Sequence, residues 1–205
     1  MSRRTVQISF CAVWLAAAAA GFAFMQRYQS AAGPVGSTPA QWPQPAGLTL
    51  DQARLTLVMF AHPRCPCTRA SLEELNRLMA QSNGRVATHI VILEPATEDA
   101  GWSDTNLRKT AEAIPNVVLH SDPNGELAKS FGAETSGFVT LFNPQGELLF
   151  KGGITKARGH AGDNAGVDAI VSFLGSASAN LSQTPVYGCG LFNPETSQCG
   201  KVCVK

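Results

Sequence analysis

The feature that most constrains this chain is a Cys-Pro-Cys turn between two periodic segments. A predominantly apolar run over residues 55–60 precedes Cys65 and Cys67, and residues 68–81 carry apolar side chains at helical spacing. The pattern predicts a buried strand, a turn that carries two thiols, and a helix. Backbone N–H groups and the helix dipole at a helix N-terminus favour a thiolate. The turn is therefore predicted to be a redox site or a site for a soft metal.

The N-terminal segment predicts a membrane anchor. Arg3 and Arg4 precede residues 8–25, which are eighteen residues without a charge. This length reaches the lower limit for a spanning helix and exceeds the usual core of a signal peptide. Two arginines in front, against one behind at Arg27, favour a cytoplasmic N-terminus and a periplasmic domain. We predict a single-pass anchor of a bacterial inner membrane over residues 1–25. Cleavage after the small residues 30–32 would instead give a secreted, soluble periplasmic protein.

Length and charge limit the remaining possibilities. A chain of 205 residues suits one domain with extensions, and its net charge of +1 gives no reason to expect a nucleic-acid partner. Residues 26–47 are rich in Gly, Pro, Ser, Ala and Gln and are predicted to be a linker. We place a folded domain at residues 48–176 and a cysteine-containing tail at residues 177–205.

Strands and helices are predicted to alternate through the domain. After the first strand and helix, the expected elements are a strand over 86–93, a helix over 105–113 capped by Ser103 or Asp104, a strand over 117–119, a helix over 125–131, a hairpin of 138–142 with 148–150, and a helix over 164–174 with Val167, Ile170, Val171 and Leu174 facing inward. This order implies a central mixed β-sheet covered by helices on both faces.

Six cysteines suit the predicted compartment. Cys11 lies within the apolar segment and is expected to pack there as a small apolar residue. The other five face an environment in which disulfides persist. Cys189, Cys199 and Cys203 in the tail form either a structural disulfide, a second redox group that exchanges with Cys65, or additional metal ligands; their spacing matches no standard zinc pattern.

These elements together resemble the thioredoxin-like superfamily over residues 48–176. The match rests on Phe60-Ala61 and Cys65-Pro66 between a strand and a helix, and on the hairpin Phe-Val-Thr-Leu-Phe-Asn-Pro-Gln-Gly-Glu-Leu at 138–148. More narrowly, residues 62–72 together with 152–155 and 158–160 resemble the RedB-type bacterial thioredoxin-like proteins. The resemblance implies a three-layer α/β fold. It also implies thiol–disulfide exchange with protein thiols and disulfides in the periplasm, with no cofactor required.

The resemblance also implies roles for the turn residues. Cys65 would be the exposed nucleophile and Cys67 the resolving thiol. Pro66 would stiffen the turn, Arg64 and Arg69 would favour the thiolate, and His62 would tune the pair. A Cys-x-Cys disulfide closes a small ring, which makes it comparatively easy to reduce.

Two features depart from the usual thioredoxin pattern. One residue rather than two separates Cys65 from Cys67. The proline that normally precedes the hairpin strand and faces the active site is absent, and Gly137 is nearest to its position. The loss of that proline argues against ordinary thioredoxin-style substrate handling.

Two alternatives stay open. His62, Cys65 and Cys67 are three donors that suit copper or zinc, and the layout resembles the anchored copper chaperones of cytochrome oxidase assembly. Those chaperones carry a histidine before the hairpin strand, for which His160 could substitute here. Copper is thus the cofactor expected under this alternative. The second alternative is a redox-inert scaffold.

Overall fold

A computed structural model describes residues 2–44, 47–95, 101–175 and 181–192 of the chain. The chain divides into two compact units, Met1–Ala31 and Ala32–Lys205.

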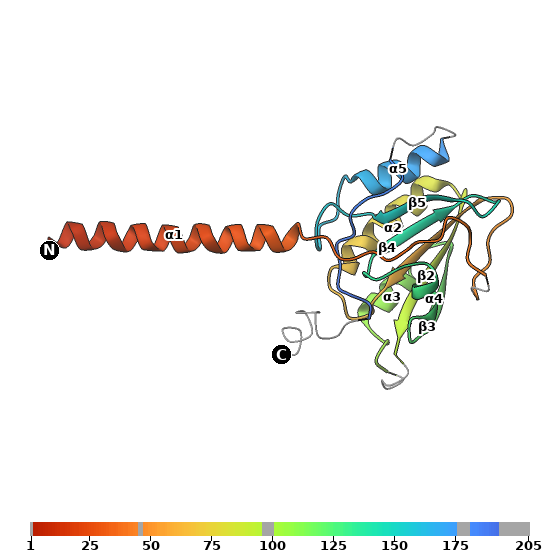
Figure 1. The fold of residues 1–205 in the computed structure, drawn as a ribbon, viewed down its shortest axis with the longest axis horizontal. Helices are drawn as coiled ribbons and strands as arrows, with labels where there is room; N and C mark the ends of the chain where they lie inside the picture. The colour runs from red at the N-terminus through yellow and green to blue at the C-terminus, as the bar shows by residue number, and fades with distance from the viewer. Residues whose placement is uncertain (1, 45–46, 96–100, 176–180, 193–205) are drawn as a thin grey trace. The chain divides into compact units, whose positions relative to one another are not determined.

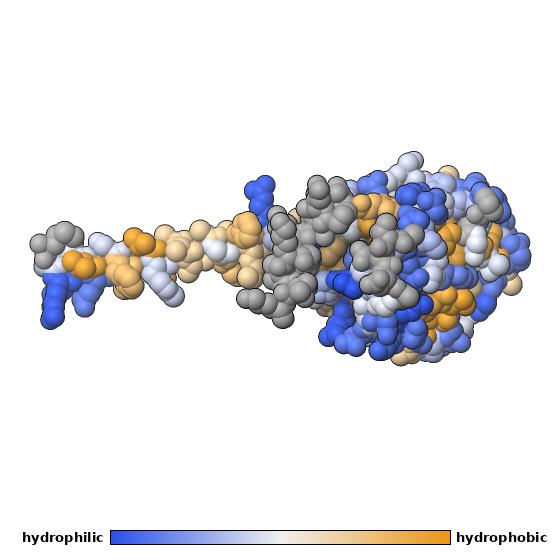
Figure 2. Space-filling model, turned by 90° about the horizontal axis from the view of Figure 1, so that it is seen from below, coloured by the Kyte–Doolittle hydropathy of each residue, from blue (hydrophilic) through white to orange (hydrophobic). Residues whose placement is uncertain are grey.

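The first unit contains one long helix, α1 (Arg3–Gln29). Its first turn is capped by Ser2, whose hydroxyl accepts a hydrogen bond from the N–H of Thr5 at 3.2 Å. Figure 2 shows that the helix surface is apolar along most of its length, with hydrophilic side chains near its N-terminus. By length and composition this helix could span a membrane, as the sequence predicts.

The second unit is a three-layer α/β domain, and this predicted fold class is confirmed (Figure 1). Its elements are β1 (Leu55–Ala61), α2 (Thr68–Ser82), β2 (Val86–Glu94), α3 (Asn106–Glu112), β3 (Val117–Pro123), α4 (Glu126–Ser130), β4 (Phe138–Phe142), β5 (Leu148–Gly153) and α5 (Ala165–Leu174). Among the described residues the sheet has five strands in the order β3-β2-β1-β4-β5. The first three strands run parallel, and β4 pairs antiparallel with both β1 and β5. This is the mixed sheet that the sequence predicts.

A separate apolar core covers each face of the sheet. On one face, α2, α3 and α5 pack on the strands through residues such as Leu75, Ala111 and Ile170. On the other face, α4 packs together with aromatic residues and with Val186 and Leu191 from the C-terminal part of the chain. The strand β1 lies at the centre of the sheet, so its C-terminal end is enclosed on both sides.

Part of the predicted linker packs against the domain. The N–H of Gly33 donates to the carbonyl of Val186 at 2.8 Å, and that of Trp42 donates to the carbonyl of Gly146 at 2.7 Å. The Trp42 ring is buried edge-on against Phe131 and Phe142, with ring centroids 5.2 Å apart in each pair. Trp42 belongs to the apolar core on the α4 face of the sheet. The folded domain therefore begins N-terminal to residue 48.

Two local predictions are wrong. The cap of α3 is Thr105, whose hydroxyl accepts from the N–H of Arg108, whereas the Ser103 hydroxyl donates to Glu94 at 2.8 Å. On α5, Val171 is 37% exposed and Ala169 faces the core in its place. An apolar residue beside the buried stripe of a helix can remain in contact with water.

Candidate active site

The Cys-Pro-Cys turn lies where the chain leaves β1 and enters α2. The N–H of Cys65 donates to the carbonyl of His62 at 3.1 Å, and the N–H of Thr68 donates to the carbonyl of Cys65 at 3.1 Å. Cys67 occupies the N-cap position of α2, and its side chain makes no capping hydrogen bond. The turn therefore brings both thiols to the N-terminus of a 15-residue helix.

Ser136 joins this turn to the segment that enters β4. Its hydroxyl accepts a hydrogen bond from the N–H of His62 at 2.8 Å and lies 2.6 Å from the hydroxyl of Thr68. Ser136 is fully buried, and Thr68 is almost so. The two hydroxyls thus connect the end of β1, the start of α2 and the approach to β4.

Gly137 lies immediately before β4, where the resemblance to thioredoxin-like proteins leads us to expect a proline. Its N–H donates to the carbonyl of Phe60 at 2.8 Å, and its φ is 88°. Proline has no N–H and holds φ near −65°, so it fits neither condition. A Cβ at Gly137 would lie 2.8 Å from the Ser71 hydroxyl. The local backbone therefore accounts for glycine at this position.

A third thiol, that of Cys189, lies against the pair. Its backbone N–H donates to Cys65 Sγ at 3.4 Å, and the side chains of Cys189 and Cys67 also hydrogen-bond with Cys65. None of these three cysteines is joined in a disulfide in the described part of the chain. Of the tail cysteines named above, Cys199 and Cys203 lie outside the described residues.

Backbone contacts hold the Cys189 segment in place. The N–H of Ser136 donates to the carbonyl of Cys189, and the N–H of Leu191 donates to the carbonyl of Glu134, both at 2.8 Å. These bonds flank an antiparallel bridge between Thr135 and Gly190. Gly188 passes so close to Ser136 that a Cβ there would meet a carbonyl oxygen at 1.9 Å, and only glycine fits.

The Cys189 segment determines which sulfur is accessible. Cys65 is 1% exposed, whereas Cys67 is half-buried. The expectation that Cys65 is the exposed nucleophile is therefore wrong for this conformation. The reason is tertiary, because residues near Cys189 cover Cys65 from a distant part of the sequence.

Electrostatics favour the thiolate at Cys65. Hydrogen bonds from the Cys189 and Cys67 thiols, the Thr68 hydroxyl and the Cys189 N–H lower the pKa of Cys65 far below its ordinary value. Burial acts in the opposite direction and is outweighed. A buried sulfur surrounded by donors is thus the anionic member of the cluster.

Cys67 is shifted in the opposite direction. The hydrogen bond with the Cys189 thiol lowers the pKa of Cys67. The hydrogen bond to Cys65, burial and the charge of Cys65 raise it, and together they outweigh the effect of Cys189. The nearby Arg158 guanidinium lowers it only in part, and the pKa of Cys67 is about 11. Cys65 and Cys67 therefore form an unequal pair in which one sulfur holds the charge and the other holds the proton.

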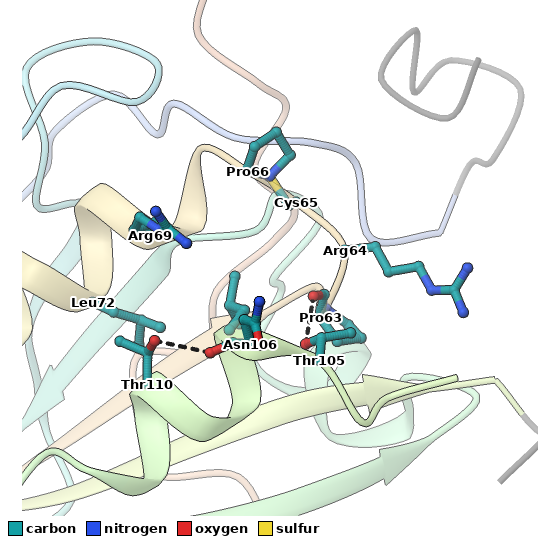
Figure 3. A pocket seen from close by; sticks show the side chains of 10 residues that line it. Pro63, Arg64, Cys65, Pro66, Arg69, Leu72, Thr105, Asn106 and Thr110 are labelled. Carbon is teal, nitrogen blue, oxygen red and sulfur yellow. Dashed lines mark hydrogen bonds between the residues drawn. The ribbon is translucent and has the colours of Figure 1, made fainter. Parts of the chain in front are cut away.

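The other predicted turn residues take up different positions. His62 is half-buried, and burial is the main cause of its lowered pKa, with Arg64 acting in the same direction and Cys65 in the opposite one. Figure 3 shows Arg64 extending away from Cys65, and its guanidinium lies 5.1 Å from the centre of the Trp102 ring. Arg69 is exposed on α2.

His160 is exposed, and its Nδ1 lies 2.7 Å from the carbonyl oxygen of Arg158. Within the described parts of the chain, no group of three or more His, Cys, Asp and Glu side chains is placed to hold a metal ion. The ligand set expected for copper, His62 with Cys65, Cys67 and His160, is thus not brought together as a metal site there.

A pocket of about 480 Å³ lies beside the turn (Figure 3). It is lined by one residue group from the turn and α2 and another from the start of α3: Pro63, Arg64, Cys65, Pro66, Arg69, Leu72, Thr105, Asn106, Leu107 and Thr110. Pro66 is exposed at its border. Among the three cysteines of the cluster, Cys65 is the one that lines this pocket.

Sequence reasoning named Cys189 together with Cys199 and Cys203 and left open whether these form a structural disulfide, a redox group or metal ligands. It assigned no site role to Thr68 or Ser136, and Arg158 entered only through the resemblance to RedB-type proteins. The only local signal for Cys189 is its pair of flanking glycines, Gly188 and Gly190, since glycine permits close backbone approach.

No family model and no curated protein matches the sequence of this chain. Similar folds occur among solved structures. An uncharacterized conserved protein from Geobacillus kaustophilus is 18% identical, with a TM-score of 0.59 over 82% of this chain and 97% of that one. A hypothetical protein from Sinorhizobium meliloti 1021 is 21% identical, with a TM-score of 0.56 over 80% and 97% of the two chains. At these identities the likeness is one of fold.

A third similar structure is the exposed lipoprotein thioredoxin Etrx1 of Streptococcus pneumoniae strain TIGR4. It is 16% identical, with a TM-score of 0.42 over 61% of this chain and 86% of that one.

Proposed function

We propose that this protein is a membrane-anchored thiol–disulfide oxidoreductase in which Cys65 and Cys67 form the redox pair. The observation that carries the proposal is the unequal pair at the start of α2. Cys65 is buried with a strongly lowered pKa, and Cys67 is half-buried with a pKa of about 11. A purely structural pair in a tight turn would not need four hydrogen-bond donors, from Cys67, Thr68 and Cys189, directed at one sulfur.

The difference in pKa and exposure between Cys65 and Cys67 indicates which sulfur the partner attacks and which sulfur leaves. In the oxidised protein, a partner thiolate attacks Cys67 Sγ, which is the more accessible sulfur. The Cys65–Cys67 bond breaks, and Cys65 leaves as the stabilised thiolate. A low-pKa sulfur is the better leaving group, so this step is favoured over attack at Cys65.

A second partner thiolate then attacks the partner's own sulfur in the mixed disulfide. Cys67 departs and takes up a proton, consistent with its raised pKa. The partner gains a disulfide, and Cys65 and Cys67 are both left reduced. A low-molecular-weight disulfide, such as oxidised glutathione, returns the pair to its disulfide form in the test below.

The compartment is part of the proposal. Helix α1 could anchor the chain in a bacterial inner membrane, and the arginine distribution favours a periplasmic domain. A compartment in which disulfides persist suits a protein that donates them.

The test is a redox titration of the full chain in detergent, with glutathione buffers and quantification of the Cys65–Cys67 disulfide by alkylation and mass spectrometry. We expect one reversible midpoint that is lost in Cys65→Ser. The oxidised protein should also convert a reduced dithiol peptide to its disulfide in a single stoichiometric turnover. Cys11→Ser is the matched control and should leave both results unchanged.

A parallel titration with Cu(I) addresses the copper-binding alternative. Tight stoichiometric binding that needs both Cys65 and Cys67, without oxidation of the peptide, would overturn the proposal. Absence of both activities would favour the redox-inert scaffold.

A further inference from the structure

We propose that Cys189 is a third redox thiol of this site, which exchanges with Cys65 so that the oxidised protein also contains a Cys65–Cys189 disulfide. The inference rests on the proposed function, because it uses the oxidising equivalent held by Cys65 and Cys67. It adds a residue that neither the turn motif nor the fold assigns to the reaction.

The first line of evidence is the contact between the sulfurs. The Cys189 N–H donates to Cys65 Sγ at 3.4 Å, and the two side chains also hydrogen-bond. Cys65 is in hydrogen-bond contact with Cys67 as well, so it is shared between two thiols. A disulfide from Cys65 to Cys189 therefore requires only small movements of side chains.

The second line of evidence is that backbone hydrogen bonds on both sides of Cys189 hold it against Cys65. Hydrogen bonds from Ser136 to the carbonyl of Cys189 and from Leu191 to the carbonyl of Glu134 fix the backbone around Cys189. Val186 and Leu191 are buried in the second core. Cys189 itself is 8% exposed, so solvent and large reagents do not compete for it. The segment is a built part of the site.

The exchange balances without an external reagent. Cys189 loses its proton and its sulfur attacks Cys65 Sγ of the Cys65–Cys67 disulfide. A Cys65–Cys189 bond forms, the Cys65–Cys67 bond breaks, and the bonding pair leaves with Cys67. Cys67 then takes up the proton, so the total number of disulfides and thiols is unchanged.

The Cys65–Cys67 and Cys65–Cys189 disulfides differ in the size of the ring that each closes. A Cys65–Cys67 bond closes a ring across a single intervening residue, which constrains the bond geometry. A Cys65–Cys189 bond joins residues 124 positions apart that the fold already holds in contact. The second form is therefore expected to resist reduction better, and it leaves Cys67 as an accessible thiol in the oxidised protein.

The experiment uses the full chain in detergent with Cys199→Ser and Cys203→Ser, so that the other tail cysteines cannot pair with Cys189. In this background we compare Cys67→Ser, Cys189→Ser and the double variant. Each is oxidised with glutathione disulfide, unfolded, alkylated and mapped by mass spectrometry. The unsubstituted chain is mapped in parallel.

The expected result is that Cys67→Ser still forms an internal disulfide, with both Cys65 and Cys189 lost from the alkylated fraction. The double variant should lose this protection. Full alkylation of Cys189 in oxidised Cys67→Ser would overturn the inference. Pairing of Cys189 with only Cys199 or Cys203 in the unsubstituted chain would also overturn it.

The same set separates this inference from the proposed function. If Cys189→Ser forms the Cys65–Cys67 disulfide while Cys67→Ser forms none, the two-thiol proposal stands and the third-thiol inference fails. If Cys65 is never found in an internal disulfide, the proposed function itself fails.

Discussion

The hydroxyl groups of Thr68 and Ser136 lie 2.6 Å apart, and this contact joins the first residue of α2 to the approach of β4. The same Ser136 hydroxyl receives the N–H of His62 at 2.8 Å. Thr68 in turn donates toward Cys65, so one buried chain of polar contacts extends from the hairpin side of the sheet to the buried thiolate. The position of Cys65 thus depends on a serine far from it in sequence.

Replacement of Ser136 by alanine should destabilise the domain. The variant leaves the His62 N–H and the Thr68 hydroxyl without their buried partner, which costs about 1–3 kcal/mol. Urea unfolding of the full chain, followed by tryptophan fluorescence, measures the change. Ser130→Ala is the matched control because its exposed hydroxyl donates to the carbonyl of Leu127 within α4, and its loss should cost much less. Equal losses in the two variants would contradict the role of the buried contact.

Replacement of Gly137 by alanine tests why this site lacks the usual proline. Gly137 combines a φ of 88° with a Cβ position 2.8 Å from the Ser71 hydroxyl. Gly84 has a φ of 75° with open space around its Cβ position. Gly84→Ala should therefore lose about 1 kcal/mol from backbone strain alone, and Gly137→Ala should lose about 1–2 kcal/mol more. Urea midpoints of the two variants that coincide would rule out the added steric cost.

Local patterns predicted most of the fold because local physics determines those parts. The alternation of apolar runs with helical spacing located β1, α2 and β2 within one residue of their ends. The hairpin of β4 and β5 followed from its Asn-Pro-Gln-Gly turn. Such elements depend on side-chain periodicity and turn residues, both of which can be read directly in a single sequence.

The candidate site was predictable only in part. Cys65 and Cys67 lie at a strand–helix junction, which a pattern can indicate. Cys189 reaches them across 124 positions, and no local pattern reports such a contact. The same holds for Trp42, whose surroundings are rich in Gly, Pro and Ala but whose ring is buried against Phe131. The exposure of Cys65 was mispredicted because the Cys189 segment that covers it is distant in the sequence.

Two histidines give the domain a pH-dependent stability. His89 Nδ1 lies 2.9 Å from His120 Nε2, and His89 Nε2 faces the carbonyl of Thr49 at 3.1 Å. Burial lowers the pKa of both rings, and the charge of His89 lowers that of His120 further. Because the unfolded chain binds these protons more readily, stability is fully present above about pH 6.5 and is lost as the pH falls below it.

We expect the free energy of unfolding to fall by on the order of 1 kcal/mol between pH 7 and pH 5 through this pair, allowing for solvent screening at His120. His120→Gln should make that decline shallower, as measured by urea unfolding at a series of pH values. The exposed His160 provides the control, and His160→Gln should retain the decline of the unsubstituted chain. Identical slopes for all three proteins would contradict a contribution from the pair.

The pH dependence of alkylation at Cys67 provides a direct measure of the unequal pair. With a pKa of about 11, Cys67 should react slowly with iodoacetamide at pH 8 and faster as the pH rises through 9 to 11. Cys65→Ala removes the hydrogen bond and the charge that raise this pKa toward 11 from its ordinary value of 9.0. A full return would raise the thiolate fraction at pH 8 by about 100-fold, and the lower nucleophilicity of the more acidic thiol reduces the net gain in rate to about tenfold. Cys11→Ala is the control and should leave the alkylation rate at Cys67 unchanged. Residue-resolved mass spectrometry measures this rate in the unsubstituted chain and in both variants. A rate at Cys67 that is equally fast with and without the Cys65 sulfur would contradict the assignment of the charge to Cys65.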